Sequence, residues 1–146
     1  MENKQLVEVL NKQLANWNVL YTKLHHFHWY VKGENFFTLH EKFEELYNEA
    51  AGHIDDIAER ILTIGGKPLA TLKSYLEVAT IEEATTELSA TEMVTTLVKD
   101  MDILIQDIKG LIKVAEDADD EVTADMFIGV QASLEKHKWM LNSFLG

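Results

Sequence analysis

Hydrophobic residues recur every three or four positions in four long stretches of the chain, which is the spacing of amphipathic α-helices. The expected helices cover residues 7–31, 36–64, 94–115 and 127–144, and a shorter helical pattern covers residues 69–79. Gly33 and the segment Gly65-Gly66-Lys67-Pro68 are typical helix ends. Ser89-Ala90-Thr91-Glu92 is a capping box that starts the third long helix.

The order of these elements predicts the fold class. Two long helices, a long connection that carries the short helix, and two more long helices are typical of an all-α four-helix bundle with one crossover. The length of 146 residues suits one core, and no repeat or linker interrupts the pattern. We therefore expect a single bundle domain over residues 1–146.

Composition narrows the setting and the chemistry. The chain has no cysteine, so disulfides and thiolate metal sites are excluded and a reducing compartment fits. No signal-like or membrane-spanning apolar run occurs, so we expect a cytoplasmic protein with no membrane partner. Thirteen basic and 25 acidic residues give a net charge of −12, which should attract cations and repel DNA. The plainer interpretation of this charge is solubility alone.

The second predicted helix carries potential metal ligands on the face away from its own core side. At about 100° per residue, these ligands share a sector of roughly 100°. They are His40, Glu44, Asp55 and Glu59. His40 and Asp55 are roughly 22 Å apart along the helix axis, so one chain cannot bring all four to one metal ion.

A second, antiparallel copy of the same helix removes this difficulty. One register pairs His40 with Glu59, Glu44 with Asp55, Phe37 with Leu62, and Asn48 with Ala51. Ala50, Ala51 and Gly52 lie near the centre and are small enough for two helices to approach closely. Such an isologous interface would contain two equivalent sites, each shared between two chains. The alternative is an ordinary solvated acidic face.

His28 lies on the apolar stripe of the first helix, where a histidine is usually a core residue. Its place near the end of that helix also lets it approach His40. Two imidazoles with carboxylates suit iron, zinc or manganese. The Glu-x-x-His motif of metal sites within a single bundle does not occur, so such an internal site is not expected.

Four segments of the chain resemble the Dps family of mini-ferritins, which are ferritin-like proteins. They read HHFHWYVKG at 25–33, FFTLHE at 36–41, DDIAERI at 55–61 and HKWM at 137–140. The resemblance places ferroxidase metal ligands at His28, His40 and Glu44 of one subunit and at Asp55 and Glu59 of its two-fold mate. Many relatives have Asp in place of Glu44.

The resemblance also implies an activity and an assembly. It implies a hollow homododecamer that oxidises Fe(II), preferably with hydrogen peroxide, and stores ferric oxyhydroxide, with zinc or manganese as substitutes for iron. DNA binding should be weak or absent, because Lys4 is the one lysine before the apolar stripe begins and the net charge is negative. The alternatives are a DNA-compacting structural protein and a bundle that holds zinc for assembly alone.

Other polar and aromatic residues have two interpretations each. Trp29 and Tyr47 could quench oxidising equivalents or simply pack. Glu41, Glu45 and Glu49 could nucleate mineral or form a solvated face. By resemblance, Asp120, Glu121 and Asp125 are candidates for an acidic pore, and the alternative is a role at the start of a helix.

The remaining candidates are assigned structural or surface roles. They are the histidines His25, His26, His53 and His137, and the pair Asp56 and Arg60, which is spaced for a surface salt bridge.

Overall fold

The computed structural model describes residues 3–85 and 87–146. In these residues the helices are α1 (Lys4–Tyr30), α2 (Phe36–Thr63), α3 (Leu72–Val78), α4 (Ala90–Asp117) and α5 (Glu121–Leu145). The prediction of an all-α bundle with a short helix in the crossover is confirmed, and the long helices begin and end within four residues of the expected positions, except that α5 begins at Glu121, six residues before the expected start at 127. None of the helices in the described part is both long and apolar enough to span a membrane.

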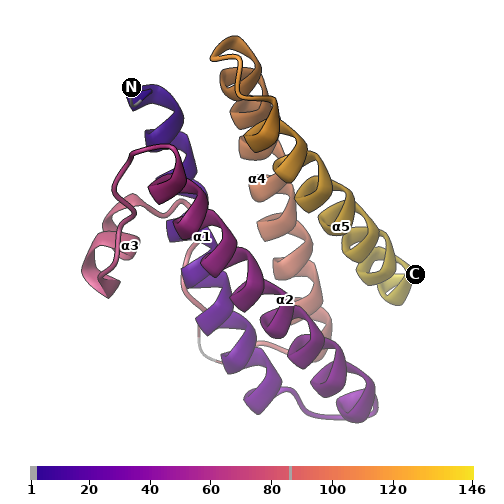
Figure 1. The fold of residues 1–146 in the computed structure, drawn as a ribbon. Helices are drawn as coiled ribbons and strands as arrows, with labels where there is room; N and C mark the ends of the chain where they lie inside the picture. Colours follow the sequence, from indigo (N-terminus) through magenta and orange to yellow (C-terminus); the bar gives the residue numbers. More distant parts are fainter. Residues whose placement is uncertain (1–2, 86) are drawn as a thin grey trace.

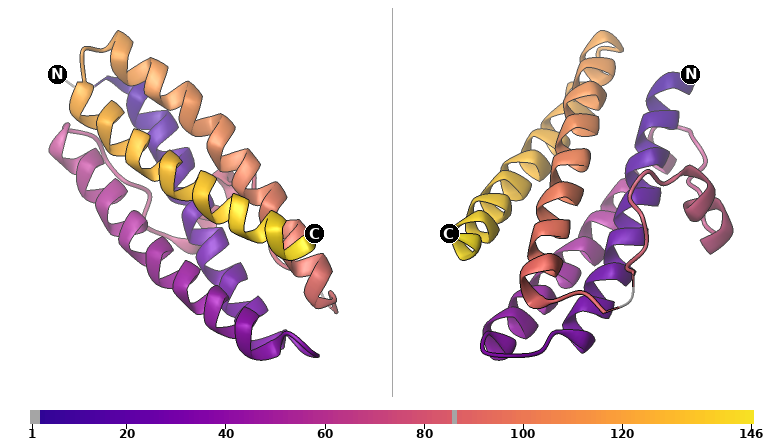
Figure 2. Two further views of the ribbon diagram at one scale, coloured as in Figure 1. Left: turned by 90° about the vertical axis from the view of Figure 1, so that its right-hand side faces the viewer. Right: turned by 180° about the vertical axis from the view of Figure 1, so that it is seen from behind.

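The four long helices form two antiparallel hairpins, α1 with α2 and α4 with α5 (Figure 1). The crossover between α2 and α4 runs back along the bundle and carries α3 on the outer side of α1 (Figures 1 and 2). As a result α2 and α4 run in the same direction, and α1 packs against α2, α3 and α4.

Helix ends follow the signals in the sequence. Ser89 and Glu92 form the expected capping box at the start of α4, with each side chain bonded to the other residue's backbone N–H. Gly33 has φ of 101° and Gly65 has φ of 88°, a conformation that glycine adopts without strain. These two glycines let the chain turn sharply at the ends of α1 and α2.

Buried polar side chains attach the crossover to α1. Asn16 is fully buried, and its side-chain oxygen accepts hydrogen bonds from the backbone N–H groups of Thr80 (2.8 Å) and Ile81 (3.0 Å). Lys23 is buried as well; its Nζ donates to the backbone oxygen of Glu82 in the crossover (2.8 Å) and pairs with an oxygen of Asp100 on α4 (2.8 Å). Burial raises the pKa of Asp100, and the Lys23 ammonium opposes this rise. These contacts fasten the connection between α2 and α4 to α1, and they tie α1 to α4.

Candidate metal centre

Two histidines at the end of α1 and the start of α2 hold each other in place. The Nδ1 of His28 lies 2.7 Å from the backbone oxygen of His40, and the Nδ1 of His40 lies 2.7 Å from the backbone oxygen of His28. The rings stack with centroids 3.7 Å apart and planes 14° apart. A carbonyl oxygen can only accept, so each Nδ1 carries the proton and donates.

This arrangement leaves the Nε2 lone pair of both rings free for a metal ion. The Nε2 of His28 lies 3.8 Å from Oε1 of Glu44, whose side chain is 52% exposed. The hydroxyl of Tyr47 donates a long hydrogen bond of 3.5 Å to the same oxygen. The structure therefore places His28 beside both His40 and Glu44, so that two imidazoles and one carboxylate lie near one another at the ends of α1 and α2. His28 is buried, as its place on the apolar stripe predicted, and it still presents a free donor.

The other two predicted ligands lie further along α2. Oxygens of Asp55, Asp56 and Glu59 lie within 4.8 Å of one another, and all three residues are exposed. The hydrogen bond and negative charge of Asp55 raise the pKa of Glu59. Closely spaced carboxylates of this kind favour a bound cation, which relieves their repulsion. Asp56 belongs to this group, although its spacing had suggested a salt bridge.

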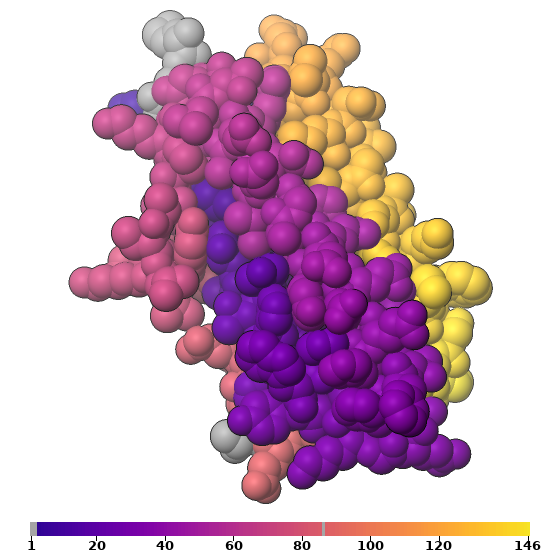
Figure 3. Space-filling view, turned by 60° about the horizontal axis from the view of Figure 1, so that its bottom comes forward, coloured from indigo at the N-terminus to yellow at the C-terminus, as the bar shows by residue number. Residues whose placement is uncertain are grey.

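Within one chain the two ligand groups remain apart on the same helix. The helical rise of about 1.5 Å per residue places His40 and Asp55 roughly 22 Å apart along the axis of α2. The face of α2 that carries them is open to solvent in the single chain, and Figure 3 shows α2 as a purple-to-magenta band across the surface beside α5. Phe37 and Leu62 on this face are 83% and 60% exposed. Each chain thus presents two separate groups of candidate ligands, a histidine half (His28, His40 and Glu44) and a carboxylate half (Asp55, Asp56 and Glu59).

Aromatic side chains surround the histidine half. The ring of Tyr47 stacks on His25 with centroids 3.8 Å apart and meets His28 edge-on at 5.3 Å. Partial burial and the neighbouring charge of Glu44 raise the pKa of Tyr47. Trp29 is 68% exposed and lies 5.4 Å from His25 between ring centroids. His25 therefore contacts both Tyr47 and Trp29, the two residues that could either quench oxidising equivalents or simply pack.

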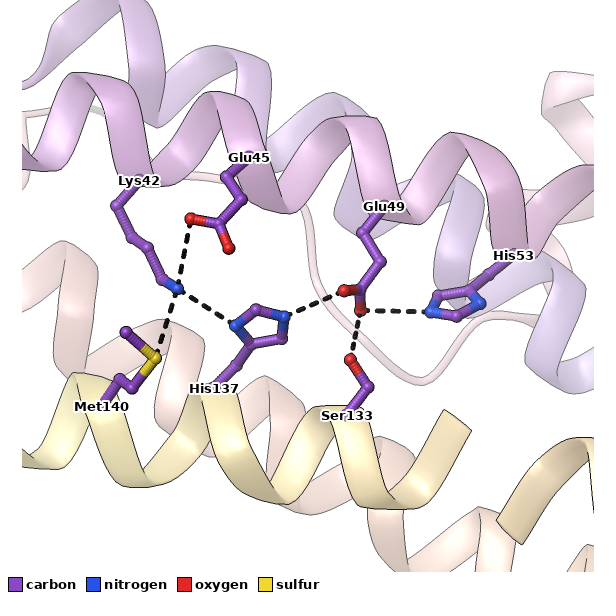
Figure 4. A network of polar contacts seen from close by, with 7 residues as sticks. All are labelled: Lys42, Glu45, Glu49, His53, Ser133, His137 and Met140. Carbon is purple, nitrogen blue, oxygen red and sulfur yellow. Dashed lines mark hydrogen bonds and ion pairs between the residues drawn. The ribbon is translucent and has the colours of Figure 1, made fainter. Parts of the chain in front are cut away.

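Glu49 does not behave as a member of a solvated or cavity-facing stripe. It points between α2 and α5, where its two carboxylate oxygens accept from His137 Nε2 (3.0 Å) and His53 Nε2 (3.2 Å) (Figure 4). The hydroxyl of Ser133 donates to it at 2.9 Å. The sequence signal for the contact of Glu49 with His53 is their spacing of one helical turn, Glu-x-x-x-His, which differs from the Glu-x-x-His motif of metal sites within bundles. The partner on α5 could be found only from the folded chain.

The predicted salt bridge between Asp56 and Arg60 is wrong. Arg60 instead reaches α5, where its guanidinium donates to Asp120 at 2.9 Å and to the hydroxyl of Thr123 at 2.8 Å. Asp120 also caps α5 by accepting from the backbone N–H of Thr123 at 3.0 Å. This pairing holds the turn between α4 and α5 against α2, which a spacing rule within one helix cannot reveal.

Asp120 is one of the acidic-pore candidates, and its contacts with Thr123 and Arg60 predict that it stabilises the fold. Burial alone would raise the pKa of Asp120, but bonds from Thr123 and the charge of Arg60 hold it below the ordinary value. A lowered carboxyl pKa stabilises the fold above the unfolded pKa, and this contribution is lost as pH falls through the folded pKa. We expect Asp120→Ala to cost about 1–2 kcal/mol at neutral pH, measured by denaturant unfolding.

The matched controls for this prediction are Glu121→Ala and Asp125→Ala, which should leave the unfolding midpoint nearly unchanged. Equal losses from all three substitutions would contradict the assignment of Asp120 as cap and tether.

The sequence and fold were compared with known proteins. A family model described as a ferritin-like domain matches residues 7–146. The chain is 58% identical to DNA protection during starvation protein 2 of Bacillus anthracis over 143 residues, which cover 98% of both chains. The chain belongs to the Dps family. The crystal structure of a Dps protein from Bacillus brevis is 58% identical and superposes with a TM-score of 0.97 over 100% of both chains. A structure of Listeria innocua Dps soaked with zinc is 45% identical, with a TM-score of 0.93 over 97% of this Dps chain and 96% of the other.

Proposed function

We propose that this Dps protein is a ferroxidase and iron store that oxidises Fe(II) at sites shared between two subunits. The main support is the pair of reciprocal hydrogen bonds between His28 and His40, which fixes both rings and leaves their Nε2 atoms free. The Nε2 of His28 lies beside Glu44. Asp55 and Glu59 of a two-fold mate complete each site. The product, ferric oxyhydroxide, is stored inside a homododecamer.

The exposed face of α2 supports this pairing. An antiparallel copy that matches His40 with Glu59 also covers the exposed apolar side chains Phe37 and Leu62 with each other. At Gly52, near the centre, a Cβ would meet nothing within 4 Å in the single chain. A neighbouring helix could therefore approach closely there. Burial of apolar area supplies the driving force for the pairing.

The ligand set suits oxidation of two ferrous ions together. In the balanced reaction, 2 Fe²⁺ + H₂O₂ + 2 H₂O gives 2 FeOOH + 4 H⁺, so peroxide takes both electrons and no hydroxyl radical is released. Carboxylates from both subunits offset the cationic charge and favour the ferric state, and the imidazoles hold fixed nitrogen positions. Zinc or manganese can occupy the same donors and would compete with iron.

The name of the Bacillus anthracis relative refers to protection of DNA. For this chain we propose that DNA is protected chemically and is not coated by the protein. The net charge of −12 opposes contact with a phosphate backbone. Removal of Fe(II) and peroxide protects DNA without binding it. Gel-shift assays at several salt concentrations would show tight, salt-resistant complexes if DNA compaction were the function.

The test is to mix the purified protein with Fe(II) and hydrogen peroxide under anaerobic conditions. We expect ferric absorbance to rise faster than in buffer and the iron to co-elute with the protein on gel filtration. Prior loading with zinc should slow the reaction because zinc occupies the same donors. Oxidation no faster than in buffer would overturn the proposal and leave a zinc-holding assembly protein as the alternative.

A further inference from the structure

A second set of metal-type side chains lies inside the subunit, between α2 and α5. Glu49 and His137 meet at 3.0 Å, and both belong to the wall of a cavity of about 10 Å³. That volume is about one water-sized sphere. In an ordinary metal site, a carboxylate and an imidazole separated in this way could both coordinate one ion.

Lys42 changes the chemistry of this pair. Its Nζ lies 3.1 Å from Nδ1 of His137, 3.5 Å from Glu45 and 3.7 Å from the sulfur of Met140 (Figure 4). The Lys42 side chain is only 12% exposed, so most of it is covered by its neighbours on α2 and α5. An ammonium has donors and no acceptor, so the Nδ1 of His137 must be the acceptor.

The proton of the His137 ring is therefore on Nε2, where it is donated to Glu49. Metal binding at Nε2 would require that proton to leave or to move to Nδ1, and Nδ1 is occupied by the Lys42 donor. Glu49 is also saturated, because His53 and Ser133 donate to its other oxygen. These donors, with His137 the strongest, hold the pKa of Glu49 well below its usual range.

We propose that Lys42 closes the interior of the subunit to metal ions and so confines iron to the sites between subunits. The ammonium supplies the positive charge that a metal ion would bring, and it fixes the His137 tautomer that has no lone pair toward Glu49. Without Lys42, the His137 proton can move to Nδ1. The Nε2 lone pair and the Glu49 Oε1 beside it are then both available to a divalent transition metal ion, while His53 and Ser133 still bond to Oε2. Confinement of iron to the sites between subunits rests on the proposed function, whereas the closure itself is tested by locating bound metal and requires no measurement of oxidation.

The test compares wild-type crystals with crystals of Lys42→Leu, both soaked in cobalt chloride and measured at the cobalt absorption edge. In the wild type we expect no anomalous peak beside Glu49. In Lys42→Leu we expect one additional peak per chain between Glu49 and His137, and one additional cobalt per chain in equilibrium dialysis. Adding His137→Phe should remove both signals.

Lys12→Leu is the matched control, because Lys12 makes an ion pair with Asp107 at 3.4 Å on another face of the bundle. It should bind no additional cobalt, which separates the specific role of Lys42 from loss of any one positive charge. Lys42→Met, whose side chain has no N–H donor for Nδ1 of His137, repeats the test if the leucine variant fails to fold. An internal cobalt peak in the wild type would overturn the proposal, as would a folded Lys42 variant with none. Peaks at His28 and His40 report on the proposed ferroxidase site separately.

Discussion

Co-expressed His40→Ala and Asp55→Ala chains should recover about a quarter of the wild-type iron oxidation rate, although each variant alone should have almost none. Random pairing makes about half of the two-fold dimers mixed. In a mixed dimer one site carries both substitutions and the other carries neither, so half of its sites are intact. The rate of ferric absorbance after mixing with Fe(II) and peroxide measures the recovery.

A second pairing supplies the control for this result. His40→Ala and Glu44→Ala change ligands from the same half of the site, so every site of a mixed dimer carries one substitution. This mixture should recover nothing, although it contains as many altered chains as the first. Recovery in both mixtures, or in neither, would mean that the two halves do not meet across a two-fold axis.

The role of His40 could be predicted from the sequence, whereas the contact of Glu49 with His137 could not. The helical pattern predicted the four long helices, and the capping box at Ser89 predicted where α4 begins. The ligands on α2 could be recognised because they share a helix, on which spacing determines the face. The reciprocal bonds of His28 and His40 were not predictable, because they depend on how the turn at Gly33 returns the chain.

Contacts between distant segments account for what the sequence missed. Arg60 has an acidic residue one turn earlier, yet it bonds to Asp120, because the start of α5 lies within its reach. The partner of Glu49 is likewise on α5, far along the chain. Spacing rules describe neighbours within a helix, and they carry no information about which helix packs alongside.

Gly52→Leu should prevent assembly while leaving the subunit folded. Gly52 lies in the middle of α2, and a Cβ there meets nothing within 4 Å in the single chain. In a helix interior leucine is more favourable than glycine by up to about 1 kcal/mol, so an isolated subunit should gain stability from the change. At a close approach of two α2 helices, a leucine side chain has no space. We therefore expect light scattering or analytical ultracentrifugation to show species smaller than the wild-type assembly, with helical circular dichroism retained.

Gly52→Leu is informative because it should stabilise the isolated subunit and at the same time weaken the assembly. Gly110→Leu is the control, because Gly110 also lies within a helix, in α4, and a Cβ there also meets nothing within 4 Å. It should show the helix-stabilising effect without separating the α2 pair. Loss of assembly in Gly52→Leu should abolish iron oxidation as well, because each chain then keeps His28 and His40 but lacks the partner's carboxylates. A fully assembled and active Gly52→Leu protein would mean that α2 does not pair closely at its centre, and the register that matches His40 with Glu59 would have to be abandoned.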